Sequence, residues 1–393
     1  MPNLLREAQR SLDRTVAASG DLFPHVTRDG RWELLPAEAG PEWHGPRWTH
    51  GNWTAGFWVG CLWLAFLWTG ENRYAAAARR WANRLAGRER DDRTHDLGFL
   101  FYPSHALGYV LTGDGALRDR ALAAADTLAA RFVPTGGYIQ AWGPRGHPDW
   151  VGTSTIDTMM NLPLLWWAAR LTGKESYRAV ATRHALTTRR SFFRPDGSTY
   201  HRVLYDSGTG RVLQTGTFQG FSDESCWSRG QAWALRGYAV AYRETQDERF
   251  LRAAEDAAGY FLRRLPDDLV PYWDFDDPAI PEAPRDSSAA AIAADGLLDL
   301  SSTHPRPEQR DSYRMWAHRL LGALAASCHN RDPDRIDGIL LHGCYSRPAG
   351  EGIDEALIWG DYFYLHALLW AHRGASPDSP GEIRAPAYPP PDP

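Results

Sequence analysis

The distribution of hydrophobic residues divides the chain into two kinds of helical segment. Six segments are apolar at nearly every position, whereas six others carry one apolar stripe among many Arg and Ala residues. A helix that is apolar all round is buried, and a helix with one apolar stripe packs at the surface. The pattern predicts inner helices over residues 53–68, 97–111, 156–171, 229–244, 287–300 and 358–372. It predicts outer helices over residues 4–18, 73–85, 117–132, 176–191, 249–265 and 311–328.

A short motif recurs where predicted inner helices end. Thr-Gly follows an apolar run in three of them, and Thr-Gln follows in a fourth: Thr69-Gly70, Thr112-Gly113, Thr172-Gly173 and Thr245-Gln246. Glycine just past an apolar helix is a C-cap signal, and the Asp/Glu- and Ala-rich residues that follow open the next helix. Each junction is therefore predicted to be the tip of a two-helix hairpin.

Paired helices of this kind bury their apolar faces either in an open superhelix or in a closed barrel. Six pairs, with a leading outer helix and a final inner helix, favour an all-α (α/α)6 barrel over residues 1–375. Strand signals are few, and the best are residues 198–204 and 212–217 around the turn-like segment 206–210. Residues 376–393 are rich in Pro and polar residues and are expected to form a disordered tail.

Charge and cysteine content argue against a nucleic-acid-binding, membrane or secreted protein. The net charge of −5, from 43 Lys+Arg against 48 Asp+Glu, provides no basic footprint for nucleic acid and no polybasic patch for a membrane surface. No segment is long and apolar enough to span a membrane, and the charged N-terminal segment lacks the apolar core of a signal peptide. The four cysteines form no CxxC pair, so a reduced, cytoplasmic protein is expected. The oligomeric state is unknown.

The chain is rich in aromatic residues but lacks the common sequence motifs for binding nucleotides or metals. The chain holds 18 Trp residues, and an indole can stack on the apolar face of a sugar ring. Most of these Trp residues are nevertheless assigned to an aromatic-rich core. No GxGxxG, P-loop, GxSxG or HExxH motif occurs, so neither a cofactor nor a metal is expected.

Unusual polar residues gather at the starts of the predicted inner helices. Because inner helices of such a barrel run in the same direction, their N-terminal ends meet at one mouth. One Asp at a helix start is more often an N-cap than a catalyst. Several starts with Asp, His, Arg and Trp are harder to explain as capping: Asn52-Trp53, Thr94-His95-Asp96, Ser154-Thr155-Ile156-Asp157, Trp227-Ser228-Arg229-Gly230-Gln231, Arg285-Asp286-Ser287-Ser288 and Gly360-Asp361.

Two carboxylates at this mouth, Asp157 and Asp96, suit glycosidic chemistry, which needs one group to deliver a proton beside supporting charge. The start of a helix favours the ionised form of Asp157, whereas burial and a second carboxylate raise its pKa. A role as acid requires that burial and the second carboxylate raise the pKa of Asp157 more than the helix start lowers it. The sequence leaves this balance open. Arg229 is equally compatible with pairing to a buried Asp and with holding a ligand.

Five motifs, in order along residues 53–370, resemble the unsaturated glucuronyl hydrolases of glycoside hydrolase family 88. Each motif is weak alone, but the ordered set is specific: Thr94-His95-Asp96-Leu97-Gly98-Phe99, residues 154–164, Gln219-Gly220-Phe221, residues 227–233 (WSRGQAW) and residues 358–363 (IWGDYF). The resemblance implies an (α/α)6 barrel, in agreement with the helix pattern. It also implies hydration of the vinyl ether of a 4,5-unsaturated uronic acid on lyase-generated oligosaccharides.

The resemblance assigns roles to individual residues. Asp157 would be the acid that protonates C4 and the base that activates water for C5, and Asp96 the second essential carboxylate. Substrate contacts are implied for His95, His201, Thr215, Thr217, Gln219, Arg229 and Trp233. Phe218 stands where relatives often carry His, and the loop 343–352 contains Glu351 but no Lys, which favours unsulfated substrates or a sulfate at another position.

Three other interpretations remain open at this stage. Two are enzymes, namely an unsaturated rhamnogalacturonyl hydrolase and an ordinary inverting (α/α)6 glycosidase. The third is a helical-repeat scaffold that binds glycans or peptides without catalysis. Loss of the ultraviolet absorbance of an unsaturated uronate distinguishes hydration from ordinary hydrolysis, and a scaffold would not depend on the acidity of Asp157.

Overall fold

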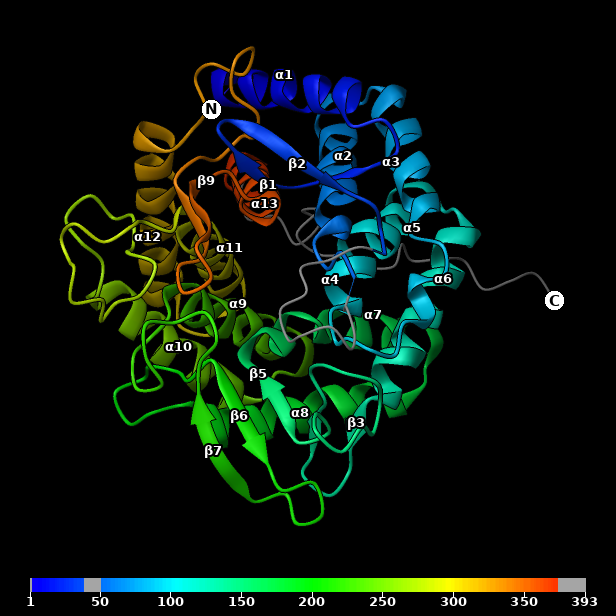
Figure 1. Ribbon diagram of the computed structural model, residues 1–393, viewed down its shortest axis with the longest axis vertical. Coiled ribbons are helices and arrows are strands. Elements are labelled where there is room, and N and C mark those ends of the chain that lie inside the picture. The colour runs from blue at the N-terminus through cyan, green and yellow to red at the C-terminus, as the bar shows by residue number, and fades with distance from the viewer. Residues whose placement is uncertain (1, 39–50, 374–393) are drawn as a thin grey trace.

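The computed structural model describes residues 2–38 and 51–373, and its helices form a two-layered ring (Figure 1). The inner layer contains α2 (Ala55–Thr69), α4 (Leu97–Phe101) with η2 (Tyr102–Ala106) and α5 (Leu107–Thr112), then α7 (Leu162–Thr172), α9 (Ser228–Thr245), α11 (Ser287–Thr303) and α13 (Ile358–Arg373). The outer layer contains α1 (Pro2–Ala18), α3 (Asn72–Arg84), α6 (Gly115–Ala130), α8 (Glu175–Phe192), α10 (Glu248–Arg263) and α12 (Pro307–Ser327). Each inner helix contacts the next, and α13 contacts α2. The ring therefore closes, as the predicted (α/α)6 barrel requires.

The hairpin tips are built as the recurrent motif predicts. Gly70, Gly113 and Gly173 end their helices with φ of 71°, 69° and 70°, and Gln246 does so with φ of 56°. The preceding threonine has a second role at each tip. The Thr69 hydroxyl donates to the Ala65 carbonyl at 2.8 Å and accepts from the Glu71 amide at 3.1 Å. The other three threonines repeat this pair of contacts, so one local device closes four hairpins.

The second inner helix is not the continuous helix predicted over residues 97–111. A π-helical turn at Tyr102–Ala106 separates α4 from α5, and Pro103 lies in that turn. Proline lacks an amide hydrogen, and its ring collides with the carbonyl four residues earlier. A π-helical turn relieves this conflict at the cost of one wider turn.

Short antiparallel hairpins precede several inner helices. The predicted pair of strands is found as β6 (Arg202–Tyr205) and β7 (Val212–Gly216), and β5 (Thr153–Thr155) joins them. The sequence did not reveal the pair β1 (Phe23–Arg28) and β2 (Arg31–Leu35), the pair β8 (Gly343–Ser346) and β9 (Glu351–Glu355), or the two-residue strands β3 (Phe132–Val133) and β4 (Tyr138–Ile139). Since β5 and β9 lead directly into inner helices, they lie at the mouth where those helices start.

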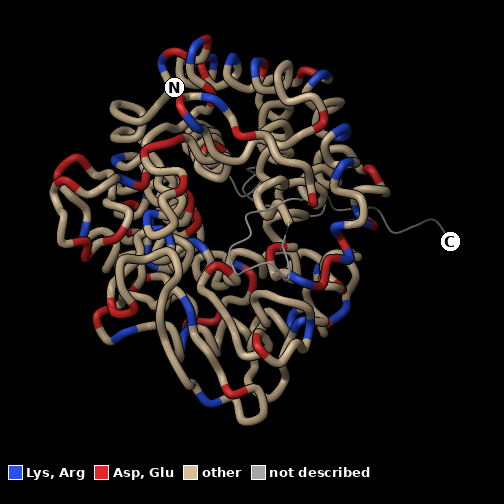
Figure 2. Tube along the Cα trace, in the orientation of Figure 1, with Lys and Arg blue, Asp and Glu red and all other residues tan. Residues whose placement is uncertain are grey.

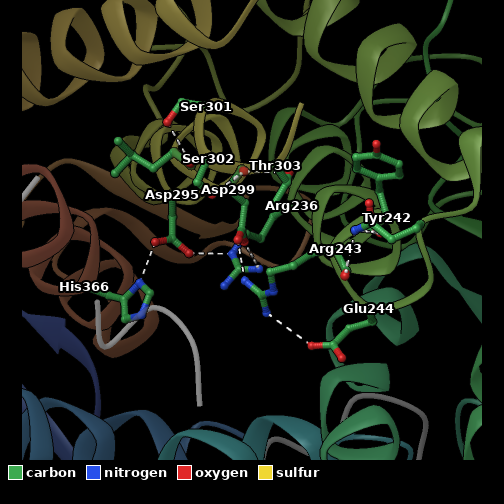
Figure 3. A network of polar contacts seen from close by, with 12 residues as sticks. Arg236, Tyr242, Arg243, Glu244, Asp295, Asp299, Ser301, Ser302, Thr303 and His366 are labelled. Atoms are coloured by element: carbon green, nitrogen blue, oxygen red, sulfur yellow. Dashed lines mark hydrogen bonds and ion pairs between the residues drawn. The ribbon is translucent and has the colours of Figure 1, made fainter. Parts of the chain in front are cut away.

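A buried ionic network occupies the part of the barrel nearer the C-terminal ends of the inner helices (Figure 3). Arg236 of α9 donates to Asp295 of α11 at 2.5 Å and pairs with Asp299 at 2.7 Å. His366 of α13 contacts the other oxygen of Asp295 at 2.5 Å. Burial by itself would raise the pKa of Asp295, but His366 and Arg236 lower it to about 2. The network ties three inner helices together away from the mouth.

The charge distribution, the helices and the cysteines of the structure bear on what the sequence predicts for the whole chain. Figure 2 shows Lys and Arg interspersed with Asp and Glu around the periphery. None of the helices within residues 2–38 and 51–373 meets the length and hydropathy that a membrane crossing needs. All four cysteines, Cys61, Cys226, Cys328 and Cys344, are buried and unpaired. The predicted tail, residues 376–393, lies outside the described residues.

Candidate active site

Asp157 lies where strand β5 turns into inner helix α7. It belongs to the 3-10 turn η3 (Ile156–Met160), and Pro163 follows in the first turn of α7, as predicted. Strand β5 pairs with β6, and the Ile156 amide donates to the His201 carbonyl at 3.0 Å. This pairing places the Asp157 carboxyl beside the imidazole of His201.

The environment of Asp157 favours its protonated form. The side chain is 16% exposed, and Oδ2 has no hydrogen-bond partner among the described residues. Burial, and then the charge of Asp96, raise the pKa of Asp157 to about 7, against a lowering effect of Arg229. The pKa of Asp157 is therefore raised from its ordinary value of 3.8, as the acid role requires. A carboxyl with a pKa near neutrality can both deliver and accept a proton at neutral pH.

His201 presents a hydrogen to Asp157. The Phe218 amide donates to Nδ1 of His201 at 3.2 Å, so this nitrogen is an acceptor and the ring hydrogen is on Nε2. Nε2 lies 3.5 Å from Oδ2 of Asp157 and has no hydrogen bond. Burial lowers the pKa of His201 to about 3, so the imidazole is neutral. Both facing atoms can therefore take a polar partner from a bound substrate.

Asp96 stands at the start of α4, and its charge acts on Asp157. The Thr94 hydroxyl donates to Oδ2 of Asp96 at 2.7 Å, and Nε2 of His95 lies 3.3 Å from Oδ1. Helix α4 approaches the turn that carries Asp157 very closely, because a Cβ added to Gly98 would lie 2.3 Å from the Cα of Asn161. Glycine at position 98 thus permits the approach that puts the charge of Asp96 within reach of Asp157.

His95 contacts both the Asp96 side chain and the turn that carries Asp157. Its Nδ1 lies 2.7 Å from the hydroxyl of Thr158, which is on the turn that carries Asp157. Burial lowers the pKa of His95 to about 3, so its ring is neutral. His95 therefore connects the segment of Asp96 to the segment of Asp157.

Asp361 shows that a raised pKa alone does not identify an acid catalyst. Burial raises the pKa of Asp361 to about 7 as well. However, its oxygens accept from the Ile339 amide at 3.0 Å and from the Leu340 amide at 2.8 Å, and the residue is 2% exposed. Asp361 is thus occupied by the backbone, whereas Asp157 keeps an oxygen without a partner.

Arg229 is held by protein groups. Its Nη1 donates to Asp286 and to the Cys344 carbonyl, both at 2.6 Å, and its Nη2 donates to the Tyr345 carbonyl at 2.5 Å. Its guanidinium lies over the ring of Trp227, 4.5 Å from the centroid. Arg229 therefore fixes strand β8 against the barrel while contributing positive charge near Asp157.

Aromatic rings enclose the mouth. The centroid of Trp53 lies 5.4 Å from that of Phe99 and 5.0 Å from that of Trp359, and Trp233 lies 5.3 Å from Phe99. The Trp233 indole nitrogen is buried without a hydrogen bond in the described chain. Phe99, Trp233 and Trp359 are buried, so these rings exclude water, and Trp53, which is half-buried, has surface that a sugar ring can cover. We call Trp53, Phe99, Trp233 and Trp359 the aromatic cluster.

The remaining sequence-predicted residues lie along β7 and the loop after it. Thr217 contacts Nδ1 of His201 at 3.1 Å, and Gln219 donates to the Tyr345 carbonyl at 3.1 Å. Thr215 stands opposite Val203 in the hairpin, and the structure gives its side chain no hydrogen bond to any described residue. The structure thus brings His201, Thr217 and Gln219 together, and places Thr215 within strand β7, two residues before Thr217.

Sequence reasoning missed Tyr345 as a site residue. Its hydroxyl accepts from the indole of Trp53 at 3.1 Å, and its carbonyl accepts from Arg229 and Gln219. Burial raises the pKa of Tyr345 above its usual range. No periodic pattern marks a residue in so short a hairpin, so only the tertiary contacts reveal it.

We expect Arg229→Ala to lower the free energy of unfolding by about 3–5 kcal/mol, because it leaves the fully buried carboxylate of Asp286 unpaired. The KM for substrate should rise as well, since the Tyr345 carbonyl loses one of its two donors and keeps only Gln219. Urea denaturation and steady-state kinetics measure the two effects. Arg229→Lys retains the charge opposite Asp286 and should recover most of the stability. An alanine variant with unchanged stability and KM would contradict this arrangement.

The sequence of this chain is similar to the sequences of known glycoside hydrolases. A match to Glycosyl Hydrolase Family 88 covers residues 25–299. The unsaturated glucuronyl hydrolase of Bacillus sp. (strain GL1) is 40% identical over 314 residues, which are 78% of this chain and 83% of that protein. The unsaturated chondroitin disaccharide hydrolase of Streptococcus agalactiae is 39% identical over 276 residues, which are 70% of this chain and 69% of that protein.

Solved structures agree with these matches. The crystal structure of the Bacillus sp. GL1 unsaturated glucuronyl hydrolase superimposes with a TM-score of 0.88 at 38% identity, covering 95% of this chain and 97% of that chain. A variant of the Streptococcus agalactiae enzyme complexed with dGlcA-GalNAc6S superimposes with a TM-score of 0.78 at 31% identity, covering 93% and 90%. The likeness thus extends over nearly the whole barrel and includes a relative with an unsaturated disaccharide bound.

Proposed function

This chain belongs to glycosyl hydrolase family 88, and from that premise we propose that it removes the 4,5-unsaturated uronic acid from the non-reducing end of lyase-generated oligosaccharides. The reaction is hydration of the C4=C5 vinyl ether. One observation carries the proposal: Asp157 combines a pKa of about 7 with an unpartnered oxygen at the mouth of the barrel. The second carboxylate, Asp96, and the aromatic cluster supply the surroundings that this chemistry needs.

In the proposed reaction Asp157 gives up one proton and later takes one back. Its carboxyl donates a proton to C4, and the electron pair of the double bond forms the new C–H bond, which leaves positive charge shared by C5 and the ring oxygen. Water then adds to C5 and returns a proton to the Asp157 carboxylate. The hemiketal opens to a ketone at C5, and C1 releases the neighbouring sugar as an alcohol. One carboxyl therefore acts first as acid and then as base.

The groups around Asp157 are suited to bind the substrate. Nε2–H of His201 lies beside Asp157. The hydroxyl of Thr217 contacts His201, and the side-chain amide of Gln219 contacts the Tyr345 carbonyl. We assign these groups, with His95, Thr215 and Trp233, to contacts with the uronate ring. Arg229 and the starts of the inner helices provide positive potential for its carboxylate. A protein of net negative charge can thus bind an acidic sugar.

Unsaturated disaccharides prepared with lyases from chondroitin, hyaluronan, heparin, gellan and ulvan provide the test. Hydration removes the conjugated double bond, so the ultraviolet absorbance of the unsaturated uronate should disappear as product forms. Ordinary glycoside hydrolysis would release the uronate with its absorbance intact. Equal cleavage of a saturated glucuronide, or no absorbance loss with any of these compounds, would overturn the proposal.

The pH dependence should report the acid form of Asp157. Because the carboxyl must be protonated to act on C4, activity should fall as pH rises through about 7, by roughly tenfold per pH unit beyond it. Measurement of kcat/KM between pH 5 and 9 on one unsaturated disaccharide gives the profile. A rate that stays constant up to pH 9 would exclude a carboxylic acid as the proton donor.

We also propose a cytoplasmic location. All four cysteines are buried and unpaired, which is typical of proteins from reducing compartments. The corresponding partner is an unsaturated oligosaccharide small enough to have entered the cell. Nucleic acid and membrane surfaces are not proposed as partners, because Lys and Arg are interspersed with acidic residues over the described chain.

A further inference from the structure

Asp96 stands at the N-cap position of helix α4 but does not cap that helix. An aspartate at this position usually accepts a hydrogen bond from one of the first backbone amides of its own helix. The side chain of Asp96 accepts none of them, and its two oxygens lie 2.7 Å from the Thr94 hydroxyl and 3.3 Å from the His95 ring. The amides of the first turn of α4 therefore need an acceptor from elsewhere.

Asn161 supplies this acceptor from the start of a different inner helix. Its side-chain oxygen Oδ1 accepts from the Phe99 amide of α4 at 2.8 Å, and its Nδ2 donates to the Asp157 carbonyl at 3.4 Å. A backbone amide can only donate, so it is the oxygen of the Asn161 side chain that faces α4. Asn161 is fully buried, and it connects the start of α4 to the turn that carries Asp157.

The side chain of Asn161 can cap α4 because its own helix does not use it. Asn161 is the N-cap residue of α7, yet it accepts no amide of α7. Pro163 is the second residue of that helix and has no amide hydrogen, so one of the usual partners of an N-cap side chain is missing. A Cβ added to Gly98 would lie 2.7 Å from Oδ1 of Asn161, so glycine at position 98 leaves the room that this contact needs.

Asp286 shows the alternative fate of an aspartate at a helix start in this mouth. At the start of α11, Oδ1 of Asp286 accepts from the Ser288 amide at 3.1 Å and from the Ser288 hydroxyl at 2.6 Å. Its Oδ2 accepts from Arg229 at 2.6 Å. Both oxygens of Asp286 thus hold protein groups in place. Asp96, whose helix is capped by another residue, instead places its charge where it acts on Asp157.

We propose that Asn161 is a positioning residue: by capping α4 in place of Asp96, it keeps the Asp96 carboxylate out of its own helix and within reach of Asp157. Without the Asn161 side chain, Asp96 is the residue whose position suits it to accept from the Phe99 amide. That contact would turn the carboxylate from Thr94 and His95, and the start of α4 would compensate part of its charge. The inference rests on the proposed function, because Asp96 is the second carboxylate of the proposed reaction.

Asn161→Ala should lower kcat on an unsaturated disaccharide by about 10- to 30-fold, because a reoriented carboxylate no longer supports the proton transfer. The loss should be smaller than for Asp96→Asn, since the carboxylate itself remains. KM should stay within about threefold, as expected when an interaction of the transition state is weakened. Steady-state absorbance kinetics, with the folded fraction determined by circular dichroism, measure both constants.

The alkaline limb of kcat should also begin at a lower pH in Asn161→Ala. The charge of Asp96 raises the pKa of Asp157, so partial compensation of that charge lowers the pKa, and less of the acid form is present at neutral pH. The other groups that act on Asp157, Arg229 and the neutral imidazole of His201, are not altered by the substitution. A mere loss of folded protein would lower the rate at every pH and leave the limb in place.

Two further single variants separate positioning from the general loss of a helix cap. Asn161→Asp keeps an acceptor oxygen for the Phe99 amide, so its kcat below pH 6 should stay within about threefold of the parent and its limb should not move to lower pH. Asp114→Ala removes the side-chain cap of outer helix α6, where Asp114 accepts from the Ala116 amide at 3.0 Å. This cap lies beside a hairpin tip, at the end of the barrel opposite the mouth, so kcat and the limb should both be unchanged.

The double variant Asp96→Asn/Asn161→Ala tests whether Asn161 acts through Asp96. Once the charge at position 96 is gone, the loss of Asn161 should reduce kcat by no more than about threefold further. A residue that supports only the fold would cause the same loss in both backgrounds.

The possible results separate this inference from the proposed function. A parent protein without activity on any unsaturated disaccharide would contradict the proposed function itself. With an active parent, equal losses in the two backgrounds or an unmoved limb in Asn161→Ala would overturn the role of Asn161 and leave the proposed function intact. If Asn161→Ala does not fold, Asn161→Asp decides, because a limb at lower pH or a kcat reduced by about tenfold in that variant would overturn the same role.

Discussion

Asp157→Asn should lower kcat on an unsaturated disaccharide by about 10³- to 10⁴-fold. The carboxyl is proposed to act as acid and then as base in one turnover, and an amide can do neither, so the loss falls at the upper end for general acid–base catalysis. KM should change little, because the uronate is held mainly by other groups. Steady-state absorbance kinetics on the purified variant measure both constants.

The same variant should remain at least as stable as the parent protein. The pKa of Asp157 is about 7 in the folded chain against an ordinary value of 3.8. A carboxyl whose pKa is raised by folding favours the folded state fully only below its ordinary pKa, and this contribution is lost as pH rises through the folded pKa. At pH 8 the ionised group thus costs on the order of a few kcal/mol, which asparagine removes. A large loss of thermal stability would undercut the assignment.

Asp361→Asn is the matched control for this variant. Asp361 shares a pKa of about 7, but its oxygens accept three hydrogen bonds from two backbone amides. Asparagine has one acceptor oxygen, so we expect this variant to lose about 1–3 kcal/mol of stability while the folded protein keeps its kcat. Equal losses of kcat in the two variants would show that burial, and not the position of Asp157, determines the effect.

Asp96→Asn should lower kcat by about 10²- to 10³-fold and move the pH profile. The charge of Asp96 contributes to the raised pKa of Asp157, so its removal lowers that pKa. Less of the acid form is then present at neutral pH, and the fall in activity begins at a lower pH. The loss is smaller than for Asp157→Asn because the proton donor itself remains.

A pH profile of kcat/KM for Asp96→Asn distinguishes this role from simple binding. A binding role alone would raise KM and leave the position of the alkaline limb unchanged. Thr94→Val removes the hydrogen bond to Oδ2 of Asp96 but keeps the charge, so it serves as the control. That variant should keep the alkaline limb near its original pH. A limb that moves to higher pH in Asp96→Asn would contradict the electrostatic coupling.

The order of helices and the places where they end could be predicted because both depend on neighbours in the sequence. The alternation of buried and amphipathic helices reflects which side chains can be exposed to water, and the Thr-Gly tips close through contacts within about four residues. The hairpin β6–β7 was predicted for the same reason. The break at Pro103 was missed because a proline in an apolar helix can be accommodated in several ways, among which the packing decides.

The short strands and the residues they carry could not be predicted in this way. Strands β1 and β9 lie side by side although more than 300 residues separate them in the chain, so no local pattern marks either. Tyr345 gains its importance from Trp53 and Arg229, which come from two other helix starts. Such contacts follow from closure of the ring and not from the composition of the hairpin.

The sequence by itself determined the barrel, its helix order and the identity of the candidate carboxylates, since these follow from local hydrophobic patterning and ordered motifs. Only the tertiary structure decided the raised pKa of Asp157 and the partners of Arg229. A pKa depends on burial and on charges that lie a few ångströms away, and Asp96 and Asp286 reach Asp157 and Arg229 from other turns of the barrel. Proton affinity is therefore a property of the assembled mouth.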